Sequence, residues 1–462
     1  MVSFNQMKKT KTAAESFRIA LLCMLAFMLP VLNSCKKESA DVTDLLSSVP
    51  SSAGVVVGFN LQSLLEKSGC KVDGSEITPG AEVASFLESR KDVKSSEREI
   101  VKLILNGESG IDPVGAIFFT DAYSSYLTVS IADTQKFTDF VEKQSGQSFA
   151  DAGNDVRTCA NVAIKGAQAW VCVSSDDAID NKAIANYSTL AEGQSFVSNG
   201  FASNISTMTN DIVGWGEIKG IMKAARMYGE MTTVNLLSGM LFEDAASLSF
   251  TMDFLKGKLE SSVSVLNSKG KPAKYLLPAD KIDVATVKSI AKTAQMYGAV
   301  CVTKDLVKKL EKMASSFGGS SAAEMFNSLK TLDGTVAVAF SDDDSFGDNI
   351  SGVVTTDGAP TLDLMSLISR VAPVRKEDNL VRFSKGAVKG EIDVEKSADL
   401  LKGSTMGVVM DMQSKMVNAG SDFRTLAISL VPASGGIKVD ITVESADDSK
   451  NILLSLLSSG AI

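Results

Sequence analysis

The sequence predicts an α+β fold made of two related halves, each an antiparallel sheet of hairpins with interspersed helices. Three observations predict this fold: short alternating apolar runs occur along the chain, turn sequences join many of them, and the order of elements repeats at an offset of about 220 residues. Strands joined by tight turns pair in antiparallel fashion, and helices between them cover the sheet. A length of 462 residues provides enough material for several buried cores.

Each half opens with a strand that runs directly into a helix. Residues 55–59 form the first strand, and Asn60 is placed to cap the helix that follows. Residues 299–302 form the second strand, and Thr303 is placed to cap its helix. We therefore expect the two openings to be equivalent.

The later elements of the two halves also correspond. Lys165-Gly166 and Lys385-Gly386 stand between alternating runs, a pattern typical of hairpin turns. A match of several elements in order favours duplication of one unit. The remaining pairs, first half before second, are strands 114–119 and 335–340, strands 126–131 and 350–355, helices near 137–141 and 360–371, and closing hairpins 246–266 and 426–443.

The repeat divides the chain into successive segments. The linker between the halves is rich in Lys and Gly and carries Pro272 and Pro278, which indicates a hinge. The expected segments are a signal peptide at 1–34, a lipidated cysteine and tether at 35–48, a first α+β repeat at 49–267, the hinge at 268–283 and a second α+β repeat at 284–462.

The first 34 residues have the organisation of a bacterial secretion signal. Basic side chains precede an apolar run of 14 residues at 19–32, which is too short to cross a bilayer as a helix. Leu32-Asn33-Ser34-Cys35 follows, and it resembles the lipobox in which the cysteine is acylated and becomes the new N-terminus. We therefore expect a lipid anchor on Cys35, held by two or more acyl chains in an outer membrane. The periplasmic and the surface-exposed side of that membrane both remain open.

Composition excludes several classes of function. A formal charge of −9 and a pI near 4.9 argue against nucleic acid as a partner, because phosphate binding needs clustered Lys and Arg. The chain contains no His, so catalytic triads and metal sites that need imidazole are excluded. The motifs for phosphate or dinucleotide binding are missing as well, and we expect no cofactor.

Two cysteines are candidates for a disulfide. If the hairpin turns at Lys165-Gly166, Cys159 and Cys172 lie directly opposite each other on one face. An oxidising envelope would permit a bond between them. The alternative is a pair of half-buried thiols, because a register slip of one residue would separate them.

An acidic loop is the one candidate for a metal site. Asp342, Asp344 and Asp348 offer oxygen ligands of the kind that Ca²⁺ prefers. The loop departs from the EF-hand pattern, since Phe346 stands at the fifth position and Val353 at the twelfth. A charged and solvated hairpin tip is the alternative.

Taken together, the lipobox, residues 49–61, the segment 108–112 and the order of hairpins resemble a family of lipoproteins from Bacteroides-like bacteria. That family is defined by a large domain of unknown function, which would span nearly the whole mature chain. The resemblance implies an envelope location and this fold. It implies no activity.

The sequence therefore predicts a lipid-anchored envelope protein of the binding or scaffold type rather than an enzyme. Its expected partners are the membrane, through the anchor, and an envelope protein or glycan. The alternative is a His-free hydrolase that uses two carboxylates on polysaccharide, which would need an Asp or Glu pair facing each other across a cleft. An open apolar patch would favour the binding module.

Overall fold

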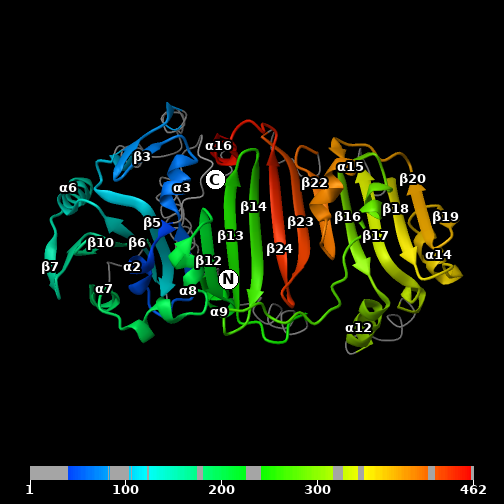
Figure 1. Cartoon of the computed structure of the whole chain (residues 1–462), viewed down its shortest axis with the longest axis horizontal. Helices are drawn as coiled ribbons and strands as arrows, with labels where there is room; N and C mark the ends of the chain where they lie inside the picture. Colours follow the sequence, from blue (N-terminus) through cyan, green and yellow to red (C-terminus); the bar gives the residue numbers. More distant parts are fainter. Residues whose placement is uncertain are drawn as a thin grey trace, which may run out of the picture.

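One long antiparallel sheet forms the centre of the molecule (Figure 1). Eighteen of the described strands belong to it, and their pairings join them in a single order from β7 to β19. The computed structural model describes residues 40–81, 83, 103–105, 107–121, 124–173, 181–224, 241–315, 326–341, 348–414 and 422–458.

The strand order runs through both halves of the chain without a break. The central pair is β14 and β24, in which Val263 lies opposite Val439. In sheet order the strands are β7 (Ala150–Gly153), β8 (Val156–Cys159), β9 (Val162–Lys165), β10 (Gln168–Cys172), β6 (Ser124–Ile131), β5 (Ile111–Asp121), β2 (Val55–Phe59), β12 (Ile212–Glu217), β13 (Ser247–Leu255), β14 (Lys258–Leu266), β24 (Gly436–Ser445), β23 (Phe423–Ala433), β22 (Met406–Asp411), β16 (Met296–Val302), β17 (Leu332–Ser341), β18 (Asn349–Thr356), β20 (Leu380–Lys385) and β19 (Val374–Glu377).

Three small two-stranded sheets stand beside the large one. They are β1 (Ala40–Asp41) with β11 (Thr207–Met208), β3 (Lys71–Asp73) with β4 (Glu76–Thr78), and β15 (Thr293–Ala294) with β21 (Ile392–Asp393).

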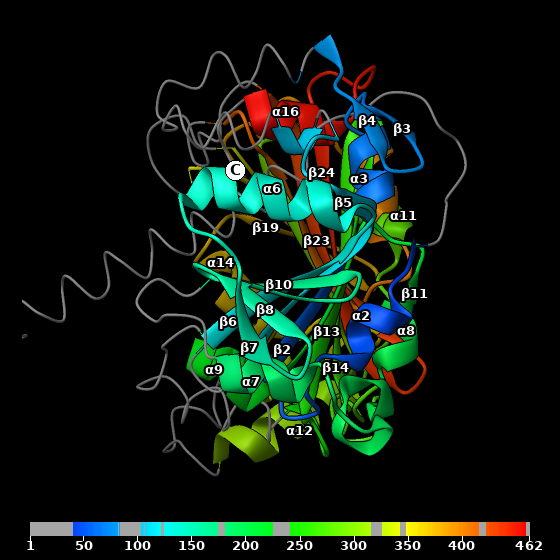
Figure 2. The same ribbon diagram turned by 90° about the vertical axis from the view of Figure 1, so that its left-hand side faces the viewer.

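Helices cover both faces of the sheet towards its two ends, as the view along the sheet shows (Figure 2). We call the side to which Ile212, Ile441 and Val338 point the α6 face, and the opposite side the α2 face. The α6 face carries α3 (Leu61–Glu66), α6 (Thr134–Ser145), α12 (Lys304–Ser315), α14 (Leu362–Ser369) and α16 (Ile452–Ser458). The α2 face carries α2 (Thr43–Ser47), α7 (Asn181–Tyr187), α8 (Ala202–Ser206), α11 (Val284–Lys288), α15 (Val394–Ser397) and the 3₁₀ turn η3 (Ala398–Leu401). The remaining helical segments are α9 (Ile218–Ala224), η1 (Glu192–Gln194) and η2 (Phe196–Ser198).

The buried cores follow the alternation of the strands. In β2, Val57 and Phe59 belong to the core under α3 and α6, whereas Val56 belongs to the core under α2 and α8. In β17, Val338 packs towards α12 and α14, and Ala339 packs towards α11 and α15. Each end of the sheet is therefore a three-layer sandwich with two cores.

Both predicted openings are confirmed. The Asn60 side chain accepts a hydrogen bond from the Ser63 N–H at 3.0 Å and caps α3. Thr303 Oγ1 accepts from the Leu306 N–H at 3.3 Å at the start of α12. The closing hairpins β13–β14 and β23–β24 also pair as predicted.

The hairpin predicted at Lys385-Gly386 is wrong. Strand β20 pairs instead with β19, through a turn in which Asp378 has a φ of 46°. Residues 392–393 pair with β15. A left-handed Asp turn is less visible in sequence than an X-Gly turn.

Two predicted helices are shorter than expected. The helix expected to reach Val371 ends at Ser369, and Val371 is exposed. The apolar pattern at 284–294, before the second opening strand, predicts a second helix, and that helix ends at Lys288. The sequence also predicts a polar helical insert at 81–105 in the first half, which lies mostly outside the described residues. Among the described helices, none combines the length and the apolar composition that crossing a membrane requires.

Candidate functional site

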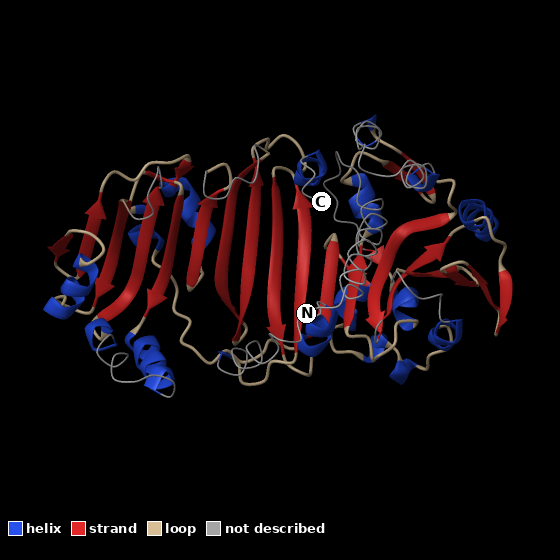
Figure 3. Cartoon of the chain, turned by 180° about the vertical axis from the view of Figure 1, so that it is seen from behind, coloured by secondary structure: helices blue, strands red, loops and turns tan. Residues whose placement is uncertain are grey.

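Eight apolar side chains on the four central strands form the candidate site, which we call the central apolar face. All eight point to the α6 side of the sheet, which Figure 3 views directly, and the described helices lie around these strands rather than across them. None of the eight belongs to a core formed by the described residues. The residues are Val263 of β14, Val439 and Ile441 of β24, Leu426 and Ile428 of β23, and Met406, Val408 and Met410 of β22.

On β22 and β23 the large side chains lie on the more exposed face. Met406 is 51% exposed, and Val408 and Ile428 are half-buried. The α2 face of the same strands carries small buried residues, among them Gly407 and Ala427. Val409 of β22 is also buried on this side, so the α2 face of these strands combines small residues with one larger apolar side chain.

Close packing of η3 explains the small residues on the covered side. A Cβ atom at Gly407 would lie 2.5 Å from Cδ2 of Leu401 and 3.0 Å from the Ile428 carbonyl oxygen, so a larger residue would force the Leu401 side chain to shift. On β14 and β24 the α2 face is polar, since Ser262 Oγ donates to Asp440 Oδ1 at 2.6 Å and Lys438 pairs with Asp440 at 2.8 Å. The polar α2 face of β14 and β24 can therefore be hydrated, whereas contact between water and the apolar face is unfavourable.

Packed cores border the central apolar face at both ends of its strands. At one end α16 contacts β14 and β24, and Leu453 shares a core with Leu259 and Val443. At the other end Phe242 shares a core with Leu430 and Ile437.

Cores border the face on its other two sides as well. Phe250 and Met252 of β13 pack against the core under α3 and α6. Beyond β16, Val338 and Phe340 of β17 pack against the core under α12 and α14. The central apolar face thus lies between these cores. Ser261 of β14 and Met296 and Val300 of β16 lie on the same side of the sheet and also belong to no described core.

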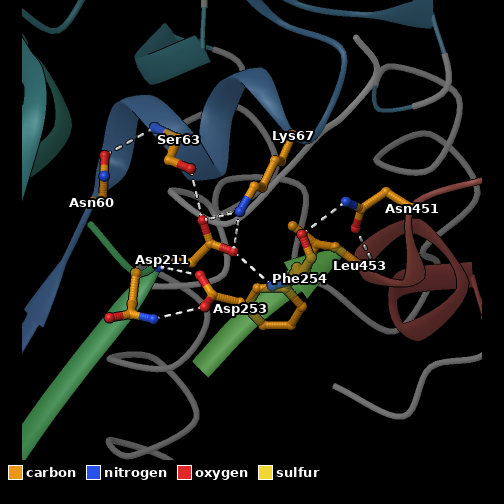
Figure 4. A network of polar contacts seen from close by, with 9 residues as sticks. Asn60, Ser63, Lys67, Asp211, Asp253, Phe254, Asn451 and Leu453 are labelled. Carbon is orange, nitrogen blue, oxygen red and sulfur yellow. Dashed lines mark hydrogen bonds and ion pairs between the residues drawn. The ribbon is translucent and has the colours of Figure 1, made fainter. Parts of the chain in front are cut away.

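A second candidate is the buried carboxylate of Asp211, next to β12 (Figure 4). Its side chain is 0% exposed, and Lys67 Nζ lies 2.6 Å from both of its oxygens. Ser63 Oγ donates to Oδ1 at 2.7 Å, and the Phe254 N–H donates to Oδ2 at 2.6 Å. The network therefore ties α3 to β12 and β13.

The same network extends to the neighbouring carboxylate and to α16. Asn210 Nδ2 donates to Asp253 Oδ2 at 2.6 Å. Asn451 Nδ2 donates to the Phe254 carbonyl at 3.0 Å, and the Leu453 N–H donates to Asn451 Oδ1 at 2.9 Å. Figure 4 shows these groups pointing towards one another.

Asp211 is not suited to act as a catalytic group on a substrate. Burial raises the pKa of its carboxyl, and the charge of Lys67 acts in the opposite direction, together with the hydrogen bonds from Ser63 and Phe254. A general acid or base must reach the proton that it transfers, whereas this side chain has no exposed surface. We therefore regard the network as a structural link.

The predicted disulfide between Cys159 and Cys172 is wrong. No disulfide joins the two residues. Lys165 pairs with Gln168, so the hairpin turns at Gly166-Ala167 and not at Lys165-Gly166. A further turn at Ala160, whose φ is 51°, places Cys159 in β8.

The two thiols consequently point to opposite sides of the sheet. Cys159 belongs to the core under α6, where its Sγ donates to the Gln147 carbonyl at 3.3 Å. Cys172 belongs to the core under α2.

The acidic loop is described in part. Asp342 and Asp344 lie outside the described residues, and Asp348 pairs with Lys385 at 2.6 Å. Within the described part of the chain, no group of acidic or cysteine side chains is arranged to hold a metal. The lipobox residues Leu32, Asn33, Ser34 and Cys35 also lie outside the described residues.

Comparisons with known proteins add little. No family model matches the chain, and no curated protein matches it either. Crystal form III of TP0453 has 11% identity and a TM-score of 0.29, and the match covers 77% of this chain and 96% of that one. Crystal form I of TP0453 has 10% identity and a TM-score of 0.28, and the match covers 77% of this chain and 95% of that one. Form IV matches with 12% identity and a TM-score of 0.28 over 48% of this chain and 79% of its own. Likeness at this level carries no argument about fold or function.

Proposed function

We propose that the chain is a lipid-anchored protein of the cell envelope that works as a binding module, with the central apolar face as its binding surface. The observation that carries the proposal is that face itself: eight apolar side chains lie on one side of four neighbouring strands, and they belong to none of the cores that the described residues form. Exposed apolar patches of this kind mark sites of interaction. The lipobox around Cys35 supports the envelope location.

We also propose that the two halves arose by duplication. Outward from the central pair, the strands follow the order β14, β13, β12, β2, β5, β6, β10 on one side and β24, β23, β22, β16, β17, β18, β20 on the other. In each series the last hairpin of the half lies innermost and the opening strand lies at the same distance from the centre. This match supports the repeat that the sequence suggests.

We prefer binding to the carboxylate hydrolase for a physical reason. The eight side chains of the central apolar face carry no ionisable group, so they can bind an apolar partner but cannot transfer protons. Asp211, the more deeply buried of the two buried acids among the described residues, already bonds Ser63, Lys67 and Phe254.

Cross-linking in living cells tests the proposal. A photo-reactive phenylalanine analogue at Ile441 faces the apolar side, and the same analogue at Thr442 faces the polar side of the same strand. We expect a cross-linked product from position 441 and none from position 442. Equal yields from both positions would contradict a binding role for this face.

The anchor has its own test. Cys35→Ala removes the thioether and the acyl chains, so the protein should move from the membrane fraction to the soluble fraction. A variant that still sediments with membranes without detergent would contradict the lipid anchor and would leave the test of the binding face unaffected.

A further inference from the structure

We propose that a short tether holds the α2 side of the first half against the membrane, so that the central apolar face points away from it. This inference rests on the lipid anchor proposed above, and it adds which surface of the protein meets the bilayer. It follows from the position of Ala40, from the number of residues between Ala40 and Cys35, and from the thickness of the fold.

The described chain begins at a packed position. Ala40 pairs with Met208 in the small sheet of β1 and β11, and the Val42 N–H donates to the Ser206 carbonyl at 2.9 Å. Ala40, Val42 and Met208 are all buried. The tether predicted at 35–48 is therefore shorter than expected, because residues 40–47 belong to β1 and α2.

This packed position lies on the α2 side of the sheet. Ala40 and Met208 share a core with Ile205 of α8. A Cβ atom at Gly58 of β2 would lie 2.8 Å from Cγ2 of Ile205, so α8 packs closely on the sheet. In Figure 2, α8 and β11 lie to the right of the central strands and α14 lies to their left.

The tether is too short to reach the other side of the sheet. Five residue steps separate Cys35 from Ala40, and a fully extended chain covers at most about 18 Å in five steps. The outer surfaces of the two helix layers are about 30 Å apart, because each layer packs about 10 Å from the sheet and a helix has a radius of about 5 Å. The acyl chains on Cys35 can therefore enter a bilayer that lies on the α2 side, but not one that covers α6.

The surface around Ala40 can rest on lipid headgroups but is not suited to insertion. Ser203, Asn204 and Thr207 are exposed, polar and uncharged, and Asp41 is exposed beside them. Such side chains stay hydrated among headgroups, whereas their transfer to hydrocarbon costs free energy. The acyl chains therefore supply the insertion, and the short tether supplies the orientation.

The orientation has a consequence for the central apolar face. That face lies on the α6 side, so the sheet itself separates it from a bilayer on the α2 side. A partner must therefore approach the central apolar face from the aqueous space, and the anchoring membrane is not that partner.

Energy transfer to labelled lipid tests the orientation. Asn204→Cys introduces a thiol on α8, Lys143→Cys introduces one on α6, and both positions are exposed. The four cysteines of the described residues are buried and the sulfur of an acylated Cys35 is a thioether, so a fluorescent maleimide labels the introduced thiol. The lipidated protein is then reconstituted into vesicles of phosphatidylethanolamine and phosphatidylglycerol that contain sparse rhodamine-labelled lipid. Transfer from position 204 should be at least about twofold stronger than from position 143, because the two layers differ by about 30 Å in height.

A longer tether is the matched control. About twenty Gly and Ser residues inserted after Ser39 give a flexible chain with a mean reach of about 28 Å, enough to release the α2 side from the bilayer. The difference between positions 204 and 143 should then fall towards equality, while attachment to the vesicles stays the same.

The outcomes separate the two proposals. A lipidated chain that does not attach to the vesicles overturns the anchor, and the orientation with it. Attachment with equal transfer from both positions, or with stronger transfer from position 143, overturns the orientation and leaves the anchor standing. A difference that survives the longer tether also overturns the inference, because surface contacts rather than the tether would then set the orientation.

Discussion

The centre and the ends of the sheet present the same sequence pattern to two different environments. Near one end, Val338 and Ile350 alternate with small residues, and α12 and α14 cover them. In the centre, Ile428 and Ile441 alternate with small or polar residues in the same way, and no described helix covers them. The difference teaches that alternation decides which face is apolar, whereas the helices between the strands decide whether that face becomes a core.

Truncation of a covered side chain should have the largest effect. Leu64 of α3 is fully buried in the core of the first half, so Leu64→Ala should cost about 4 kcal/mol of unfolding free energy. Ile441→Ala in the central apolar face should cost about 1 kcal/mol, because the side chain leaves no closed cavity. Urea denaturation of both variants measures the difference. A loss at Ile441 equal to that at Leu64 would mean that the central face is a covered core.

Removal of the buried carboxylate should be nearly as costly. Asp211→Ala leaves Lys67 and the Phe254 N–H without their partner, and we expect a loss of about 3 kcal/mol. This value lies at the lower end for a broken buried pair, because 21% of the Lys67 side chain is exposed.

The exposed pair of Asp348 and Lys385 is the matched control. Asp348→Ala should change stability by less than about 0.5 kcal/mol. Thermal unfolding compares the two variants. A loss at Asp211 as small as that at Asp348 would show that the network of α3, β12 and β13 does not hold these elements together.

Thiol reactivity should distinguish the covered cores from the open face. Burial raises the pKa of the Cys70 thiol to about 11, so at pH 8 about one thousandth of it is thiolate. An introduced Ile441→Cys should have a pKa near the ordinary value of about 8.5 and react much faster. Mass spectrometry after timed alkylation of the folded protein gives both rates. Rapid labelling of Cys70 would contradict its burial.

The smallest effect is expected at the most exposed methionine. Met406→Gln should change the unfolding free energy by no more than about 0.5 kcal/mol, because half of the side chain already contacts water. Calorimetry of this variant measures the change. A loss above about 2 kcal/mol would indicate that another part of the chain packs on Met406.

The sequence predicted the two strand-to-helix openings and the closing hairpins, because each has a local signal. Alternation identified β23 and β24, and Asn60 and Thr303 identified two helix starts. The turns at Ala160 and Asp378 have no such signal, since non-glycine residues adopt positive φ there.

The candidate site could not be predicted, for a different reason. Leu426 and Ile428 alternate with Thr425 and Ala427 as core residues would in a covered strand, so nothing in their spacing distinguishes an open face. Asp211 was also missed, because its partners Lys67 and Phe254 come from distant parts of the chain. Contacts at long range decide both features.

The seam between β14 and β24 has a consequence for synthesis. During translation β14 is complete long before β24 leaves the ribosome, and until then its outer edge has unpaired N–H and C=O groups from Lys258 to Ser264. Another nascent copy that supplies its own β24 could pair with this edge first. The sheet that joins the two halves in one molecule therefore also offers a route by which two molecules could exchange them.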